Sequence, residues 1–174
     1  MQDESSFYLN GIPKKMLAKK GSRPILRVNG SKKRKHVSGA IDLRDHTGTF
    51  AFIKSLNAKT YKKFLRYLLR KYSGPGIIYV ITDNAPAHRA KALKKFLHKV
   101  RDKLKLIYLP PYSPDLSEIE QLWFIIKEKV VYNAFYGTFQ EFESALTRSL
   151  KQLKPSNDVI KKLCNYEKYL PCEG

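Results

Sequence analysis

The chain contains few cysteines and no long apolar run. Only Cys164 and Cys172 occur among its 174 residues. No pattern of Cys or His ligands surrounds them, which argues against a structural zinc site, and their number excludes a disulfide framework. No apolar stretch is long enough to cross a bilayer, and no signal peptide precedes the first polar residues. We therefore expect an intracellular protein with no membrane partner.

Acidic residues are also scarce, because 15 Asp and Glu face 34 Lys and Arg, for a formal charge of +19. Repulsion of this size disfavours a compact state unless a polyanion offsets it. A nucleic-acid backbone is the expected partner, and its binding should weaken steeply with added salt. The alternative is a generically basic soluble protein or a structural binder of the ribosomal kind.

Much of this positive charge lies between residues 10 and 36. Glycines and prolines in this stretch predict hairpin connections rather than a helix. We expect either a DNA-facing loop near the active edge of the protein or a solvated loop, and the sequence leaves both open. The candidate nucleic-acid contacts in this stretch are Lys14, Lys15, Lys19, Lys20, Arg23, Lys32, Lys33, Arg34 and Lys35.

The periodicity of apolar residues predicts a strand cluster followed by alternating helices and strands. With 43% hydrophobic residues, the chain fits one α/β domain with a mixed sheet and helices on both faces. The run 77–81 is continuously apolar, which is typical of a strand buried on both faces. The expected strands are 5–9, 37–43, 49–56, 77–81 and 104–109, and the expected helices are 59–72, 86–100, 117–131, 139–153 and a weaker one after Pro155.

Several acidic residues occupy positions where carboxylates do chemistry, although each has a structural alternative. Asp83 ends the 77–81 strand, where ligand sites in open sheets lie, but an Asp there also caps helices. Ser117-x-x-Glu120 fits a helix capping box, and Glu118 competes with Glu120 because side chains two apart diverge on a helix.

The remaining acids are weaker candidates. Asp3 and Glu4 would point to opposite faces of a strand, so one could face a metal while the other is solvated. A solvated chain end is the simpler interpretation. Asp42 and Asp45 are spare candidates, of which Asp45 lies in an expected turn.

Three blocks together resemble the catalytic domain of DDE transposases of the mariner superfamily, including prokaryotic insertion-sequence relatives. The second and third blocks are long and specific, and 36 residues separate Asp83 from Glu120, close to the family's gap. The blocks are Asp3-Glu4-Ser5-Ser6-Phe7, Asp83-Asn84-Ala85-Pro86-Ala87-His88-Arg89-Ala90, and Leu109-Pro110-Pro111-Tyr112-Ser113-Pro114-Asp115-Leu116 through Ile119-Glu120-Gln121-Leu122-Trp123.

The resemblance implies a ribonuclease H-like fold and a catalytic trio of Asp3, Asp83 and Glu120. These carboxylates would bind Mg²⁺ or Mn²⁺, with two ions expected. Water would cleave a strand at a transposon end, and the freed 3′-hydroxyl would attack target DNA. His88 and Arg89 are further candidate DNA contacts. His88 could instead support the metal ligands from behind, or simply lie on the surface of a helix. Trp123 is expected to pack under the site.

The chain departs from the family pattern in two places. Ser117-Glu118 replaces the usual Asn-Pro, which preserves a helix cap. Only Met1 and Gln2 precede Asp3, and the family's helix-turn-helix region is absent.

These departures predict one ribonuclease H-like catalytic domain over residues 1–174, truncated at its N-terminus, cytoplasmic and nucleoid-associated. We expect this chain alone to bind DNA without sequence preference and to cleave it weakly or not at all. The alternative is an inactive remnant that only binds DNA. A homodimer is an option by resemblance, although no dimerisation heptad is present.

Overall fold

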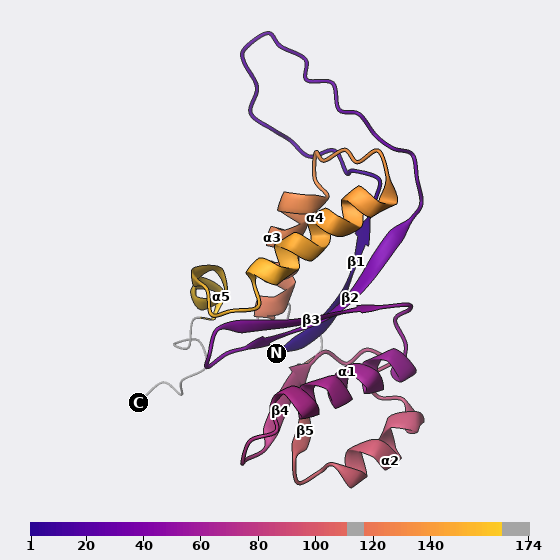
Figure 1. The fold of residues 1–174 in the computed structure, drawn as a ribbon, viewed down its shortest axis with the longest axis vertical. Coiled ribbons are helices and arrows are strands. Elements are labelled where there is room, and N and C mark those ends of the chain that lie inside the picture. The colour runs from indigo at the N-terminus through magenta and orange to yellow at the C-terminus, as the bar shows by residue number, and fades with distance from the viewer. Residues whose placement is uncertain (111–116, 165–174) are drawn as a thin grey trace.

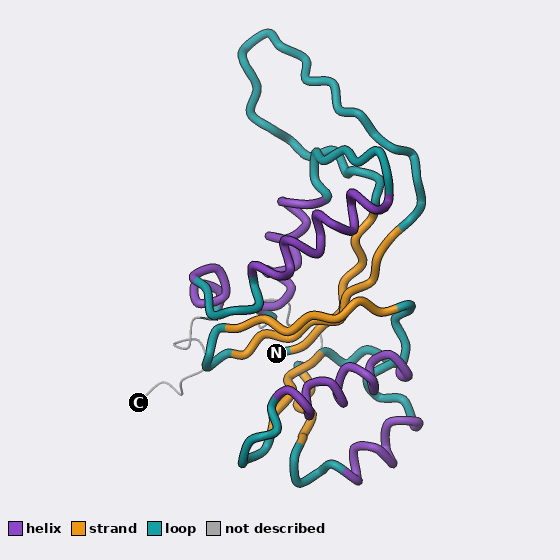
Figure 2. The backbone as a smooth tube through the Cα atoms, in the orientation of Figure 1, coloured by secondary structure: helices purple, strands orange, loops and turns teal. Residues whose placement is uncertain are grey.

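The computed structural model describes residues 1–110 and 117–164, so most of the Pro-rich block and Cys172 lie outside the described residues. Figure 1 shows the arrangement of the elements, and Figure 2 separates helices, strands and loops. The elements are β1 (Gln2–Tyr8), β2 (Arg34–Asp42), β3 (Thr47–Ile53), α1 (Ala58–Lys71), β4 (Ile78–Thr82), α2 (Lys91–Lys99), β5 (Leu104–Tyr108), α3 (Glu118–Val130), α4 (Phe139–Gln152) and α5 (Asp158–Leu163).

The strands form two hydrogen-bonded sets rather than one continuous ladder. β1, β2 and β3 make an antiparallel sheet in that order, and β4 pairs with β5 in parallel. β1 and β4 still contact one another, and the Thr82 hydroxyl donates a hydrogen bond of 2.9 Å to Gln2 Oε1. The expected α/β architecture is therefore confirmed, with side chains rather than a backbone ladder joining its antiparallel and parallel parts.

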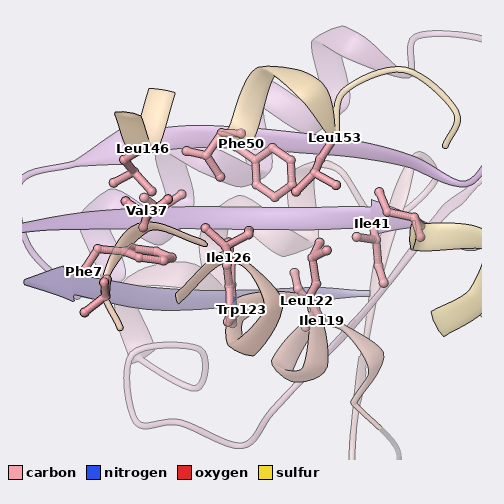
Figure 3. Packing of buried hydrophobic residues seen from close by; sticks show 14 of the residues in the cluster. Phe7, Val37, Ile41, Phe50, Ile119, Leu122, Trp123, Ile126, Leu146 and Leu153 are labelled. Atoms are coloured by element: carbon pink, nitrogen blue, oxygen red, sulfur yellow. The ribbon is translucent and has the colours of Figure 1, made fainter. Parts of the chain in front are cut away.

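The larger core lies between the three-stranded sheet and helices α3, α4 and α5 (Figures 1 and 3). Alternate residues of β2 face it, because side chains two apart share one face of a strand. Trp123 sits at its centre and meets the rings of Phe7 and Phe50 edge-on at centroid distances of 5.9 and 5.8 Å. Burial of each large apolar side chain here contributes about 1.5–3 kcal/mol. The buried members shown in Figure 3 include Val37, Ile41, Ile119, Leu122, Ile126, Leu146 and Leu153.

A second core lies on the other side, where α1 and α2 pack against β4 and β5. Ala40 of β2 also belongs to this core, so helices cover both faces of the structure as expected. Helix α1 begins at a capping box in which Asn57 and Thr60 exchange hydrogen bonds. The periodicity predicts this helix to within a residue, since its apolar stripe is unbroken.

The expectation that β4 is buried on both faces is wrong. Val80 is buried against α1 and α2, but its neighbour Tyr79 is 56% exposed. Ile107 of β5, which pairs with Ile81, is also exposed at 45%. The helices cover one side of the β4–β5 pair, so the apolar run reflects only one strongly buried face.

The helix expected from residue 86 begins instead at Lys91, and residues 86–89 form turns. The Asp83 side chain accepts a hydrogen bond of 3.0 Å from the Ala85 N–H, and the His88 N–H donates one of 2.9 Å to the Ala85 carbonyl. These local bonds turn the chain before the helix starts. The prediction failed because Pro86 suits a helix start and a tight turn equally well.

A long loop joins β1 to β2 and extends away from the sheets and helices (Figures 1 and 2). It leaves β1 at Tyr8, the end opposite Asp3. A strand rises about 3.3 Å per residue, so the base of the loop is more than about 15 Å from Asp3. The loop is therefore not beside the Asp3 end of the strand, which disfavours a position at the active edge, and its contact with DNA stays a prediction. No helix in the described part of the chain is long and apolar enough to span a membrane.

Candidate active site

Asp3 lies on β1 opposite a glycine that makes room for an aromatic ring. Its backbone partner on β2 is Gly39, and a Cβ built on Gly39 would lie 2.4 Å from the Trp123 ring. Because no side chain fills that space, the indole crosses the sheet surface and donates a hydrogen bond of 3.0 Å to Asp3 Oδ2. Trp123 thus packs under the site, as expected, and also holds the carboxylate.

The Asp3 carboxyl resists ionisation in this setting. Burial raises its pKa to about 7, and the nearby charges of Glu4 and Asp83 act in the same direction. Hydrogen bonds from the Glu4 backbone and the Trp123 side chain oppose the rise but do not cancel it. Asp3 and Asp83 are therefore close enough to repel one another, although β1 and β4 are far apart in sequence.

Asp83 follows the last residue of β4, and its side chain is 52% exposed. Its Oδ1 lies 2.6 Å from His88 Nδ1 and also accepts the bond from the Ala85 N–H. No hydrogen bond from the described residues reaches its second oxygen, Oδ2. The carboxylate is therefore fixed through one oxygen, and its other oxygen, on a half-exposed side chain, has no hydrogen-bond partner among the described residues.

His88 is buried, with a side chain only 1% exposed, and it lies between two acids. Its Nε2 is 3.0 Å from Glu4 Oε2, and its ring stacks on Tyr61 at a centroid distance of 4.1 Å. The expectation of a helix-surface histidine is wrong, since His88 precedes α2. Both ring nitrogens face carboxylates, which leaves neither for a DNA phosphate and corrects that part of the prediction.

Glu4 points to the face of β1 opposite Asp3, as the strand geometry predicted. It is not solvated, however, because its side chain is only 12% exposed. Its Oε1 accepts hydrogen bonds of 2.8 Å from Gln2 Nε2 and 3.2 Å from the Ser38 hydroxyl, while Oε2 faces His88. Both oxygens are thus used within the protein.

The pair formed by His88 and Asp83 is charged at neutral pH. Burial alone would lower the pKa of His88, but hydrogen bonds to Asp83 and Glu4 outweigh it and raise the pKa to about 10. The same hydrogen bond from His88 lowers the pKa of Asp83 against the opposing effect of partial burial. The imidazolium therefore forms an ion pair with the Asp83 carboxylate.

Glu120 lies in the first turn of α3 and is exposed, whereas Glu118 is buried. The Ser117 side chain makes no capping hydrogen bond, so the expected capping box is wrong. Glu120 precedes Trp123 by about one turn and shares its face of the helix. Within the described residues no hydrogen bond or ion pair joins Glu120 to Asp3 or Asp83, so its membership of the trio stays a prediction.

The spare acidic candidates have local roles. Asp42 Oδ1 accepts hydrogen bonds of 2.9 Å from the Arg44 N–H and 3.1 Å from the Asp45 N–H. These bonds hold the turn between β2 and β3, which is an ordinary use of Asp.

The donor chemistry at Asp3 and Asp83 fits a divalent cation. No group of three or more His, Cys, Asp or Glu among the described residues is already arranged around a metal position. The carboxylates nevertheless offer the hard oxygen ligands that Mg²⁺ and Mn²⁺ prefer. Burial chiefly raises the pKa of Asp3, with smaller contributions from the charges of Glu4 and Asp83, and a bound cation would favour the ionised carboxylate against these effects.

The basic candidates divide into paired and exposed groups. Lys14 forms an ion pair with Glu128, Lys35 pairs with Glu143, and Arg34 stacks over Tyr8. Arg89 is exposed, and its guanidinium lies over the Tyr108 ring at 5.5 Å. Among the candidates, the exposed residues of the β1–β2 loop that form no ion pair with an acid of the described structure are Lys15, Lys19, Lys20, Arg23, Lys32 and Lys33.

Sequence reasoning missed Gly39 and the part played by Glu4. A glycine inside a strand commonly marks a close approach by another group, and this signal could have singled out Gly39. Nothing in the spacing of Glu4 and His88 along the chain indicates that they touch, because they meet only after β1 and β4 come together.

Comparison with known proteins finds a match to the family model described as DDE superfamily endonuclease over residues 1–143. An uncharacterised 39 kDa protein of insertion element IS630 from Shigella sonnei is 25% identical over 134 residues. That match covers 76% of this chain but only 38% of the relative.

Solved structures of similar fold include the Mos1 transposase paired-end complex with the left transposon end, at a TM-score of 0.68 and 21% identity. The Mos1 mariner paired-end complex with Mn matches at 0.69 and 21% identity. Both matches cover 96% of this chain and 52% of the Mos1 chain, so this chain spans about half of its structural relatives. The catalytic core domain of BIV integrase matches at a TM-score of 0.50 and 14% identity, over 78% of this chain and 91% of that domain. These likenesses establish a ribonuclease H-like fold.

Proposed function

Because this chain belongs to the DDE superfamily of endonucleases, we propose that it is a transposase catalytic domain that cleaves DNA strands and transfers them to target DNA. The observation that carries the proposal is the family match over residues 1–143, which includes Asp3, Asp83 and Glu120. The electrostatic coupling of Asp3 with Asp83 and the contact of α3 with Asp3 support it.

DNA as the substrate is supported by charge and by the relatives. The formal charge of +19 suits a polyanion. One Mos1 structure of similar fold is a complex with a transposon end. The exposed lysines of the β1–β2 loop provide one surface for a phosphate backbone, and Arg89, near Asp83 in sequence, provides another.

We assign Asp3, Asp83 and Glu120 as the residues that would hold Mg²⁺ or Mn²⁺, with two ions as the full complement. Mos1 complexes with Mn and with Mg are among the similar structures, which supports the choice of cation. When bound, such ions would activate the attacking oxygen and neutralise charge on the phosphate and the leaving oxygen.

The chain's own residues prepare this site. Trp123 donates its N–H to Asp3, which fixes the carboxylate on β1. His88 and the Ala85 N–H hold Asp83 through Oδ1 and leave Oδ2 available on a half-exposed side chain. Fixing ligands before substrate arrives matters, because a displacement of about 1 Å can cost roughly 10²-fold in rate. Glu120, exposed at the start of α3, would complete the ligand set from a third element.

The proposal is tested by incubating the chain with labelled duplex DNA and Mn²⁺ or Mg²⁺. We expect metal-dependent nicking, weak for this chain alone, that falls to the metal-free background in Asp83→Ala. Asp102→Ala is the matched control, since Asp102 is 90% exposed and lies in a turn away from these acids. Equal nicking by wild type and Asp83→Ala would contradict the assignment.

The alternative, a domain that only binds DNA, is favoured by the exposed lysines of the β1–β2 loop. The same experiment separates the two functions. DNA binding without metal-dependent nicking, together with the absence of any Mn²⁺ binding sensitive to Asp83, would favour the binding function.

A further inference from the structure

The contacts around His88 distinguish the two acids beside it. Glu4 uses both carboxylate oxygens within the protein, because Oε1 accepts from Gln2 and Ser38 and Oε2 faces His88 Nε2. Asp83 uses only Oδ1 in its described contacts. Glu4 is therefore suited to anchor the ring, whereas Asp83 is suited to bind something outside it.

The ring itself has little freedom to move. Tyr61 stacks on one side at a centroid distance of 4.1 Å, and the Thr82 hydroxyl lies 3.1 Å from Nδ1. The His88 backbone carbonyl accepts a hydrogen bond of 3.1 Å from the Tyr108 hydroxyl. Residues from α1, β4 and β5 thus hold both the ring and its backbone. The position of Glu4 on β1 can therefore determine, through the ring, where the Asp83 carboxylate lies at the end of β4.

We propose that His88 is a positioning residue whose two ring nitrogens contact Glu4 and Asp83 and so hold Asp83 ready to bind a divalent cation. The inference rests on the proposed function, because it takes Asp83 as a metal ligand. It adds that the first acidic motif supplies two acids with separate tasks. Asp3 would face the metal, and Glu4 would support Asp83 through His88.

Such supporting contacts have measurable effects, since loss of a hydrogen-bond partner behind a metal ligand typically costs about 10–100-fold in metal affinity. Two substitutions test the roles of the two ring nitrogens separately. His88→Asn can retain a donor near Nδ1, facing Asp83, while His88→Gln can retain one near Nε2, facing Glu4. A purely structural histidine would make the two variants equivalent in metal affinity, because each loses the buried ring.

The experiment titrates Mn²⁺ into each variant and follows the free-ion signal by electron paramagnetic resonance. We expect His88→Gln to bind Mn²⁺ about 10–100-fold more weakly than wild type and His88→Asn to retain more of the affinity. The matched control is His36→Asn, since His36 also hydrogen-bonds to a β1 side chain, Ser6, at 2.7 Å but contacts neither Glu4 nor Asp83. Equal affinity in His88→Gln, His88→Asn and wild type overturns the inference.

Far-UV circular dichroism of each variant checks that it folds, and Asp83→Asn separates this inference from the proposed function. If Mn²⁺ binds wild type and Asp83→Asn equally, the proposed function fails at Asp83, and the role in metal positioning fails with it. Loss of affinity in Asp83→Asn but not in His88→Gln leaves the proposed function standing and rejects the role of His88.

Discussion

The Trp123 indole donates a hydrogen bond of 3.0 Å to Asp3 Oδ2, and this bond joins helix α3 to the first acid of the chain. The two residues are 120 positions apart in sequence. Glu120 lies in the first turn of the same helix, about one turn before Trp123, so the contact fixes how two proposed metal ligands lie relative to one another. Several measurable consequences depend on this bond and on the space that permits it.

Replacement of Trp123 by Phe should remove the N–H while keeping an aromatic ring in the core. We expect the variant to be less stable at pH 8 by about 1.5–3 kcal/mol, the range for a hydrogen bond to a charged group. Mn²⁺ binding should also weaken, because the bond that is removed favours the ionised form of Asp3. Denaturant unfolding and an Mn²⁺ titration would measure both effects. Phe124→Leu is the control on the same helix, since Phe124 is half exposed, and an unchanged Trp123→Phe protein would contradict the role of the bond.

Asp3 should make the protein's stability depend on pH. Burial raises its folded pKa to about 7, above its ordinary value of 3.8, so the folded state binds this proton more tightly than the unfolded state. The free energy of unfolding should therefore lose a contribution from Asp3 as pH rises from 4 through 7. Asp3→Asn, which stays neutral, should be more stable than wild type at pH 8, and the advantage should shrink toward pH 4.

Urea unfolding of wild type and Asp3→Asn across this pH range would measure the difference. The Asp83–His88 pair also contributes to the pH dependence, because its stabilisation is full below 6.5, the ordinary pKa of His88, and declines as pH rises toward about 10, the folded pKa. This contribution is common to both proteins and cancels in the difference between them. An Asp3→Asn variant that is less stable than wild type at pH 8 would show that the ionised carboxylate is not costly. Mn²⁺ affinity of the wild type should fall below pH 7, since the metal competes with the Asp3 proton.

Gly39→Ala should displace the indole from Asp3. The added Cβ would lie 2.4 Å from the Trp123 ring and 3.0 Å from Phe50, so the ring must shift. We expect a loss of stability of about 1–3 kcal/mol from overpacking, together with weaker Mn²⁺ binding. Gly74→Ala is the matched control, because nothing lies within 4 Å of its added Cβ. Equal thermal unfolding of both variants would contradict the close packing at Gly39.

The exposed lysines of the β1–β2 loop should contribute to DNA affinity by neutralising phosphates. In Lys19→Ala/Lys20→Ala, the slope of log affinity against log salt should decrease in magnitude by about 0.9 for each phosphate that the variant no longer neutralises. Fluorescence anisotropy with one duplex at several salt concentrations measures this slope. Lys161→Ala/Lys162→Ala removes the same charge from α5 and serves as the control, and identical slopes in the two double variants would exclude a special role for the loop.

The sequence predicts the elements whose pattern is local. Helices α1 and α4 have unbroken apolar stripes, so their bounds are predicted to within one or two residues. The predicted start of α2 is wrong because Pro86 and Asp83 support a turn as readily as a helix. The exposed face of β4 could not be predicted, since an apolar run does not reveal which side the helices cover.

For the candidate site, too, features that are local in sequence could be predicted and contacts between distant elements could not. The acidic motifs are visible as sequence blocks, and the opposite directions of Asp3 and Glu4 follow from strand geometry. Contacts made by distant elements are not visible. The bond from Trp123 to Asp3, the space at Gly39 and the position of His88 between Glu4 and Asp83 all depend on how the two cores come together.

The central claim is that Asp3, Asp83 and Glu120 together hold a divalent cation, and a crystal structure grown with Mn²⁺ tests it most directly. We predict an anomalous scattering peak bound by Asp83 Oδ2 and by an oxygen of Asp3, with the Glu120 carboxylate turned toward it. A Mn²⁺ ion bound elsewhere, or no peak beside Asp3 and Asp83 at saturating metal, would contradict the claim.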